Sequence, residues 1–374
     1  MIRRSSLRIS NAILILLAAS GLSLPDYARS AQKTAPVPND PLEIVTSRIK
    51  TADNPSRRSA AVDLLGRARN SYALRSSVHA YDLKVTFEVN SGGQTSFDGA
   101  WEMEDIYDPQ QGLRWTAKNG TAYSTTQIAT SDMFYGQGTA DYIPLRLQEA
   151  RAALFDPIPT AAHVGRAAIR TSKAFFNGAQ ITCILLSRSG IAAAATPGRH
   201  WEETVECIDP KSGLLQMHSQ IPGRYYSYDY TNASQFAGRT LPRKVTVTEA
   251  GKVVSEITVR SIEELPGVDP SLFVPTEEMK TRGQSVAMAG AQKITRVIGR
   301  SPVDPGATIH PVCVFGLVTA AGELVEAHSL QPSDPNSQAA VEAAKQINFS
   351  NPTPIVSRPQ QHFVFIIEKF VSSQ

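Results

Sequence analysis

The sequence predicts an α+β protein in which a large curved antiparallel β-sheet, a half-barrel with covering helices, is followed by a small α/β-type domain. Two observations indicate this fold class. Between residues 81 and 262, short segments of alternating apolar and polar residues recur, separated by turns rich in Gly, Asn, Asp and Pro. After Pro275 the composition changes, and a second set of apolar strands with an Ala-rich helix begins near Ile294.

Ordered structure is expected to begin with a helix at Ser59, which is a suitable N-cap. The apolar residues after it follow helical spacing: Ala61, Leu64, Leu65, Ala68 and Tyr72. This stripe gives the helix one face to bury. A second helical interval is expected around residues 142–154, ended by Asp156-Pro157.

The first strand is predicted at residues 81–89, where apolar side chains alternate with polar ones, so that one face is buried. Turn residues at 91–93, 108–112 and 119–120 separate the strands that follow, and such short connections require antiparallel pairing. The remaining strands of this half of the chain are predicted at residues 97–103, 113–117, 180–187, 201–208, 214–218, 226–230, 243–248 and 253–262.

Nine or ten strands in meander order are most simply arranged as one curved antiparallel sheet with helices on its concave face. A curled sheet covered by helices encloses apolar space, so its inward side chains are candidates for lining a ligand cavity. These candidates are Leu83, Val85, Phe87, Trp101, Trp115, Tyr226 and Tyr228. The alternative is that they are ordinary core residues, and unfilled volume is what separates the two interpretations.

The chain divides into five segments on composition and periodicity. Residues 1–30 are a leader, and residues 31–58 are rich in Pro, Asn and Asp and are expected to be loosely structured. The half-barrel domain is predicted over residues 59–275. Residues 276–293 have no periodic pattern and are interpreted as a linker before a small domain at 294–374.

The leader has the layout of a secretory signal peptide. Three arginines precede an apolar stretch at residues 12–24, and Ala28-Arg29-Ser30 supplies small residues for cleavage after Ser30. As a helix this stretch would rise only about 20 Å, against roughly 30 Å of hydrocarbon. We therefore expect export to the periplasm with cleavage. The alternative is an uncleaved anchor in the inner membrane, with the body facing the periplasm.

The net charge of +3 comes from this leader. Residues 1–30 hold four arginines and one aspartate, which leaves 33 of the 37 basic and 33 of the 34 acidic side chains in the body. A neutral body gives no reason to expect nucleic acid as a partner.

The tail has a recognisable order of elements. An apolar strand at 311–319 leads to a hairpin tip at Gly322 followed by Glu323-Leu324-Val325, then an Ala-rich helix at 337–347, the run Asn348-Phe349-Ser350-Asn351-Pro352, and a closing strand at 362–371. Over residues 295–371 this order resembles the C-terminal domain of TonB-family energy transducers. The resemblance implies a small domain that docks an envelope protein through edge-strand pairing.

The larger domain is similar in layout to LolA-like periplasmic carriers of lipoproteins and lipids. The similarity rests on the order of elements, on Phe97-Asp98-Gly99-Ala100-Trp101-Glu102 before Leu113-Arg114-Trp115, and on the run from Cys207 to Leu215. In that family the half-barrel holds an acyl chain. The resemblance therefore implies an apolar or acyl-chain ligand and no enzyme activity.

The positions of the three cysteines predict which of them are bonded. Cys183 and Cys207 lie in two predicted strands, 24 positions apart. In an exported chain we expect them to form a disulfide, with two buried free thiols as the alternative. Cys313 lies in an apolar strand and is expected to fill the core.

No motif for catalysis, a metal or a cofactor is found. The seven histidines are scattered without a metal-ligand spacing: His79, His163, His200, His218, His310, His328 and His362. His200 and Glu202 would share one face of the predicted strand at 201–208, which is more typical of a polar surface pair than of an acid/base couple. The chain also lacks a nucleophile elbow, a phosphate loop and a dinucleotide fingerprint.

The sequence therefore favours an exported, non-enzymatic, two-domain envelope protein that binds a lipid-like ligand in the large domain and a protein through the small one, in transport across the periplasm. Two alternatives stay open. One is an N-terminally anchored TonB-like energy transducer for outer-membrane transport. The other is an uncharacterised hydrolase acting on the concave sheet face.

Overall fold

The computed structural model describes residues 50–51, 54–76, 78–93, 97–130, 134–155, 157–187, 199–201, 203–282, 287–299, 307–319, 321–349 and 360–373. The predicted leader and most of the segment at 31–58 lie outside these residues. Within the described residues, no helix is both long and apolar enough to cross a membrane.

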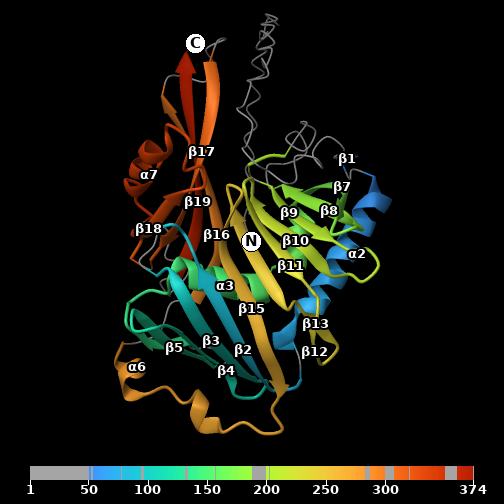
Figure 1. Cartoon of the computed structure of the whole chain (residues 1–374), viewed down its shortest axis with the longest axis vertical. Coiled ribbons are helices and arrows are strands. Elements are labelled where there is room, and N and C mark those ends of the chain that lie inside the picture. The colour runs from blue at the N-terminus through green and yellow to red at the C-terminus, as the bar shows by residue number, and fades with distance from the viewer. Residues whose placement is uncertain are drawn as a thin grey trace, which may run out of the picture.

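Most of the chain forms one antiparallel sheet of 13 strands that is strongly curved and is not closed into a barrel (Figure 1). Its strands are β1 (Lys50–Thr51), β2 (Tyr81–Val89), β3 (Gly99–Asp108), β4 (Gly112–Asn119), β5 (Tyr123–Ala129), β6 (Phe134–Gly138), β7 (Ala168–Phe176), β8 (Ala179–Ser187), β9 (Thr204–Ile208), β10 (Leu215–Ile221), β11 (Arg224–Asp229), β14 (Lys244–Glu249) and β15 (Lys252–Glu264).

The strand order differs from the simple meander that the sequence predicts. The order is β1-β7-β8-β9-β10-β11-β14-β15-β2-β3-β4-β5-β6, so β15 pairs with β2 in the middle of the sheet. Four of the thirteen strands, β1, β5, β6 and β7, were not expected from the sequence. β1 has only two residues, and β5, β6 and β7 carry too few apolar residues at alternate positions to stand out, as in Tyr123-Ser124-Thr125-Thr126-Gln127. A short ribbon of β12 (Ser234–Phe236) and β13 (Arg239–Leu241) lies outside the large sheet.

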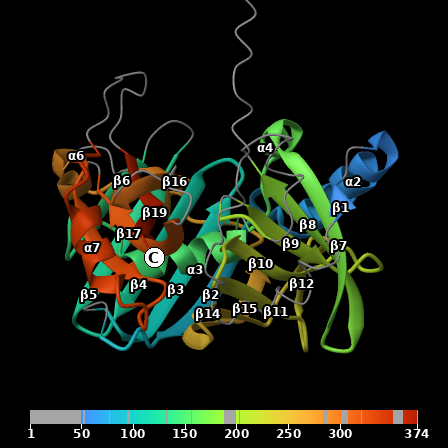
Figure 2. The ribbon, with the colours of Figure 1, turned by 90° about the horizontal axis from the view of Figure 1, so that it is seen from above.

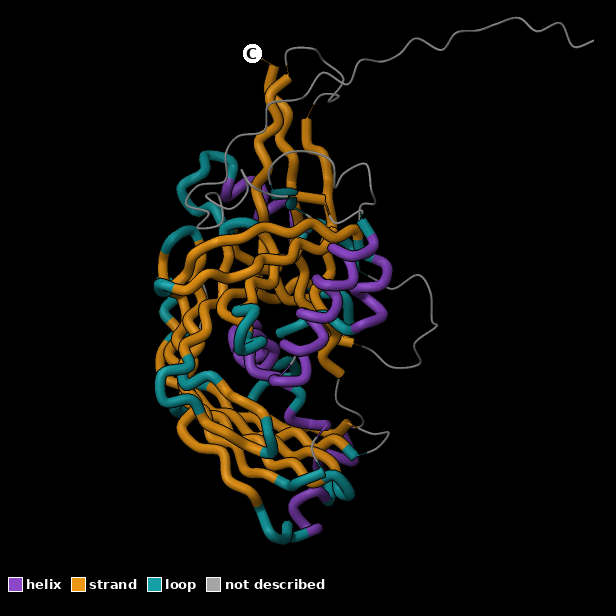
Figure 3. Tube along the Cα trace, turned by 90° about the vertical axis from the view of Figure 1, so that its right-hand side faces the viewer, coloured by secondary structure: helices purple, strands orange, loops and turns teal. Residues whose placement is uncertain are grey.

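This strand order explains why a helix crosses the inside of the curve. β6 is one edge of the sheet, and β7 lies next to β1 at the opposite edge. Residues 139–167 must therefore pass from edge to edge, and they include α3 (Leu145–Phe155) and α4 (Ala161–Arg166). Figure 3 shows helices within the curve of the strands. The expected arrangement of a curved antiparallel sheet with helices on its concave face is confirmed.

The first long helix, α2 (Pro55–Tyr72), begins four residues before the expected start at Ser59. Its N-cap is Asn54, whose Oδ1 accepts a hydrogen bond from the Ser56 amide at 2.9 Å. Pro55 occupies the first helical turn, where the missing N–H costs nothing. The pair Asn54-Pro55 was therefore the actual start signal. The buried stripe contains the five predicted residues, and a 3₁₀ turn, η1 (Leu74–Ser76), follows the helix.

The tail forms its own four-stranded sheet in the order β16-β19-β17-β18. Its elements are β16 (Ala287–Gly299), β17 (Ala307–Val318), β18 (Leu324–Ser329), α7 (Ser337–Lys345) and β19 (Gln360–Ser373). The expected succession of strand, hairpin, helix and closing strand is present. β16 pairs parallel with β19, whereas β17 pairs antiparallel with both β18 and β19.

The segment interpreted as a linker at 276–293 is not without structure. After the 3₁₀ turn η2 (Pro270–Phe273), residues Glu277–Arg282 form α6, and β16 begins at Ala287. Met279 of α6 is buried with Phe273 and Ile128, so α6 packs on the large sheet. A helix of six residues is too short to show a clear apolar period, so α6 was not predicted from the sequence.

Candidate ligand-binding site

The seven residues predicted to line a cavity all lie on the concave face of the large sheet. Each is at most 6% exposed, and all belong to one apolar cluster that also contains residues of α2 and α3. They come from β2, β3, β4 and β11. Within this cluster the rings of Phe87 and Trp101 stack with centroids 5.2 Å apart. The strands thus bring the seven residues onto one continuous apolar surface.

This surface is covered by α3 rather than open. Leu147, Ala150, Ala153 and Leu154 of α3 are buried in the same cluster. Of the seven residues, Val85 lies beside a hollow on the described part of the protein, and the other six line neither this hollow nor the hollows at His163 and Asn90. The hollow beside Val85, of about 590 Å³, is lined largely by polar residues such as Lys84, Glu102 and Arg260. In this conformation the side chains of α3 occupy the concave face.

The C-terminal half of α3 is held by a buried ion pair. Arg151 Nη1 lies 3.0 Å from Asp105 Oδ2 on β3, and the two side chains are 2% and 0% exposed. Asp105 also accepts a hydrogen bond from the Tyr81 hydroxyl at 3.0 Å. The Arg151 guanidinium lies 3.9 Å from the centre of the Trp115 ring. Burial lowers the pKa of Arg151 to about 10, although Asp105 acts in the opposite direction.

The N-terminal half of α3 enters a second buried cluster of charges. Arg146 donates from Nη1 and Nη2 to the two oxygens of Glu249, at 2.8 and 2.9 Å, and also pairs with Glu149 at 2.9 Å. Arg224 Nε lies 2.9 Å from Glu249, and its guanidinium also pairs with Glu149. His328 Nε2 lies 3.1 Å from Glu249 Oε2. Two arginines thus balance two carboxylates around a histidine.

The charges in this cluster shift the acidities of its members. Burial acts to raise the pKa of Glu249, but the charges of Arg146 and His328 and their hydrogen bonds lower it well below its usual value. Burial lowers the pKa of His328 despite the neighbouring carboxylate. At neutral pH, above the pKa of both groups, Glu249 is therefore ionised and His328 is neutral.

The small domain also contacts α3. The Leu145 amide donates to Glu326 Oε1 of β18 at 3.0 Å. Arg224 lies 4.3 Å from the centre of the Phe315 ring, which stacks on Phe365 at 4.8 Å. Seen from above, α3 lies between the strands of the small domain and those of the large sheet (Figure 2). A ligand that reached the concave face would have to displace α3 against contacts from both domains.

The residues that hold α3 were not singled out from the sequence, but a signal for some of them was present. Asp105 lies in phase with Trp101 and Met103 on β3, so a carboxylate stands at an inward position. Arg146 and Glu149 are spaced three apart on one helix face. A charged residue in phase with apolar ones predicts a buried charge, which requires a partner elsewhere in the chain.

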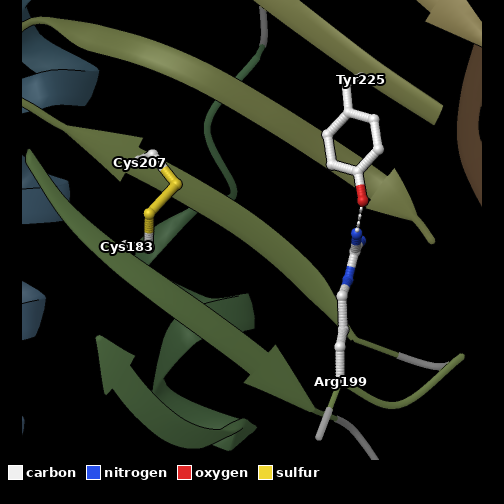
Figure 4. Close-up of a disulfide and its surroundings, with 4 residues drawn as sticks. All are labelled: Cys183, Arg199, Cys207 and Tyr225. Carbon is white, nitrogen blue, oxygen red and sulfur yellow. Dashed lines mark hydrogen bonds between the residues drawn. A yellow bond between two sulfur atoms is a disulfide. The ribbon is translucent and has the colours of Figure 1, made fainter. Parts of the chain in front are cut away.

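The predicted disulfide is confirmed. Cys183 and Cys207 are opposite each other on β8 and β9 and are joined by a bond of 2.04 Å (Figure 4). They lie on the convex side of the sheet in a second apolar cluster with Tyr225. Arg199 Nη1 donates to the Tyr225 hydroxyl at 3.0 Å. Cys313 is a buried free cysteine in a third cluster, at the contact between the two domains.

The histidines do not form a metal site in the part of the chain that the structure describes, where no group of three potential ligands is found. His200 is not in a strand as expected, because β9 begins only at Thr204. The His200 amide instead donates to Glu203 Oε2 at 2.8 Å. Glu203 is fully buried and pairs with Arg170, so this acid contributes to structure.

Comparison with known proteins gives only distant structural similarities. No protein-family model matches the chain, and no curated protein matches it. A putative outer membrane lipoprotein-sorting protein domain from Vibrio parahaemolyticus superposes with a TM-score of 0.35 at 7% identity, covering 58% of this chain and 97% of that one. A LolA superfamily protein from Nitrosomonas europaea superposes with a TM-score of 0.35 at 9% identity, covering 57% of this chain and 97% of that one.

A third similar structure is the MucA/MucB complex of Pseudomonas aeruginosa, with a TM-score of 0.26 at 11% identity, covering 71% of this chain and 82% of that one. At these values the similarities do not establish a family. None of the three is described as a TonB C-terminal domain, so the resemblance of the tail to that domain gains no support from them.

Proposed function

We propose that this protein is an exported, non-catalytic binding protein that holds an apolar, acyl-chain ligand on the concave face of its large sheet. The observation that carries the proposal is the continuous apolar surface formed by β2, β3, β4 and β11, which is covered by a single crossing helix, α3. Burial of an acyl chain there would be driven by removal of apolar surface from water.

Ligand uptake requires α3 to move, since its side chains contact the surface that the ligand would use. The contacts of α3 are of two kinds, apolar contacts along the helix and buried ion pairs at Arg146 and Arg151. An acyl chain can replace the apolar contacts made by residues such as Leu147 and Leu154. It cannot replace the ion pairs, so their strength sets the free-energy cost of opening.

The test is photo-crosslinking of the purified chain with a diazirine-bearing fatty alcohol, whose headgroup is uncharged, followed by peptide mapping. We expect labelled peptides from β2, β3, β4 and β11, and competition by an unlabelled fatty alcohol. Labelling confined to the polar convex hollow around Lys84, or no saturable labelling at all, would overturn the proposal. Asp105→Asn should increase labelling because it loosens α3, whereas Glu102→Gln, an exposed acid on the same strand, should not.

Export is part of the proposal and is supported by the leader and by the disulfide between β8 and β9, since disulfides persist in oxidising compartments. N-terminal sequencing of the mature protein tests it. A start at Ala31 supports a free periplasmic protein, whereas an intact Met1 in the membrane fraction supports the anchored alternative.

A protein partner is proposed for the small domain, on the ground that β16 is an edge strand of its sheet. Edge strands offer unpaired backbone groups to another chain. A photo-crosslinking residue at the exposed Thr295 of β16 should capture a partner in living cells, and the same residue at the exposed Phe175 of β7 should not. Equal capture at both positions, or none at Thr295, would contradict this part of the proposal.

A further inference from the structure

One buried acid on the concave face differs from the others. Glu206 of β9 is fully buried, and neither of its carboxylate oxygens accepts a hydrogen bond. Asp105, Glu149 and Glu249 are also buried, but each faces at least one arginine. A buried carboxylate that accepts no hydrogen bond has a desolvation cost that is not offset by any interaction with a donor. The surroundings of Glu206 are therefore incomplete in this conformation.

The position of Glu206 is fixed by the register of three strands. Glu206 is opposite His218 of β10, and His218 is opposite Tyr226 of β11. His218 Nδ1 lies 3.5 Å from Glu206 Oε1 and makes no hydrogen bond. The imidazole packs against the Tyr226 ring with centroids 5.4 Å apart. Glu206 and His218 thus form a polar pair directly across the strands from Tyr226, which belongs to the apolar surface.

The pair is continuous with the surface that α3 covers. Tyr228, the next inward residue of β11, donates its hydroxyl to the Ala153 carbonyl of α3 at 3.3 Å. Burial is the main reason why the pKa of Tyr228 lies well above its usual value, and the charges of neighbouring groups, among them Glu206, raise it further. Displacement of α3 would therefore open the apolar surface up to the edge of the polar pair.

We propose that Glu206 is the anchor for the headgroup of the bound ligand, and that this ligand is an acyl or alkyl chain carrying a primary ammonium group. The inference rests on the proposed function, because the chain is what occupies the apolar surface. An ammonium supplies both the positive charge and the hydrogen-bond donors that the two free oxygens lack. A carboxylate headgroup would instead place a second negative charge beside Glu206 and be rejected.

The test compares ligands with one chain length and three headgroups: dodecylamine, dodecanol and dodecanoate. Each is titrated at pH 7, below its micelle concentration, in competition with a fluorescent acyl probe on the full chain. We expect dodecylamine to bind at least about tenfold more tightly than dodecanoate, which corresponds to about 1.4 kcal/mol. Glu206→Gln should bring the two affinities to within about twofold. The exposed control Glu256→Gln should leave the ratio unchanged.

The outcomes separate this inference from the function on which it rests. If none of the three ligands displaces the probe from the wild-type protein, the proposed function fails. If all three displace it with equal affinity, or if Glu206→Gln keeps the wild-type ratio, the ligand-binding function stands and the role of Glu206 is wrong. The wild-type ratio needs no variant, so a folding defect in Glu206→Gln would not leave the inference untested.

Discussion

Replacement of Asp105 by Asn tests whether buried charge holds α3 on the concave face. The substitution keeps the shape of the side chain, and the Tyr81 hydroxyl can still donate to Oδ1. What is lost is the charge that balances Arg151, in a pair whose members are 2% and 0% exposed, and also the longer ion pair with the partly exposed Arg75 at 3.5 Å. Breaking a buried ion pair from one side costs about 3–5 kcal/mol, because it leaves the other charge uncompensated. We expect the lower end, since Arg151 keeps its contact with the Trp115 ring.

The assay is urea unfolding followed by tryptophan fluorescence and circular dichroism. A second variant, Asp105→Asn with Arg151→Met, removes both charges and should recover more than half of the lost stability. Glu102→Gln, which breaks an exposed pair with Lys118, should cost less than about 1 kcal/mol. If Asp105→Asn costs no more than this exposed control, the account of how α3 is held is wrong.

Three further predictions concern the charge cluster, the disulfide and the interface between the domains. The pKa of His328 is lower in the folded state than the value of about 6.5 in the unfolded chain, so the unfolded chain binds the proton first and the free energy of unfolding falls as the pH drops below about 6.5. His328→Gln should therefore make the free energy of unfolding less dependent on pH between 5 and 7.5. An unchanged pH dependence would contradict this. Reduction of the Cys183–Cys207 bond should cost about 3 kcal/mol in urea unfolding, and reduced and oxidised protein with equal midpoints would refute it. Phe365→Ala should lower the free energy of unfolding by about 3–5 kcal/mol and increase amide hydrogen exchange in α3, because the Phe365 ring stacks on Phe315, which in turn contacts Arg224. Faster exchange limited to β19 would show that the two domains are not coupled there.

The sequence predicted secondary structure best where one face of an element is buried and the other is exposed to solvent. The alternation in residues 81–89 predicted β2 with its observed bounds, and the apolar runs in the tail predicted the order of its elements. The sequence was least informative where the pattern is diluted by threonine and glutamine, as in β5, or where an element is as short as α6. In both cases too few apolar positions remain to define a period.

The candidate surface and a helix that covers the concave face were predicted from the sequence, but the path of that helix and the ion pairs that hold it were not. Inward alternation identified residues such as Phe87 and Trp101 because burial is a local property of a strand face. The position of α3 follows from the pairing of β15 with β2, which places β6 and β7 at opposite edges. That pairing joins residues about 170 positions apart along the chain, and no local pattern specifies it. The ion pairs to Asp105 and Glu249 depend on the same long-range arrangement.

The proposed function requires an apolar ligand to bind where α3 now packs. Native mass spectrometry of the mature protein, purified from its own envelope without detergent exchange, would detect such a ligand. We expect a non-covalent adduct with the mass of a lipid or alkyl-chain amphiphile, which dodecylamine displaces and which Asp105→Asn retains more strongly because α3 competes less with the ligand. A single mass for the unliganded chain, with no adduct formed by wild type or Asp105→Asn when acyl or alkyl amphiphiles are added, would contradict it.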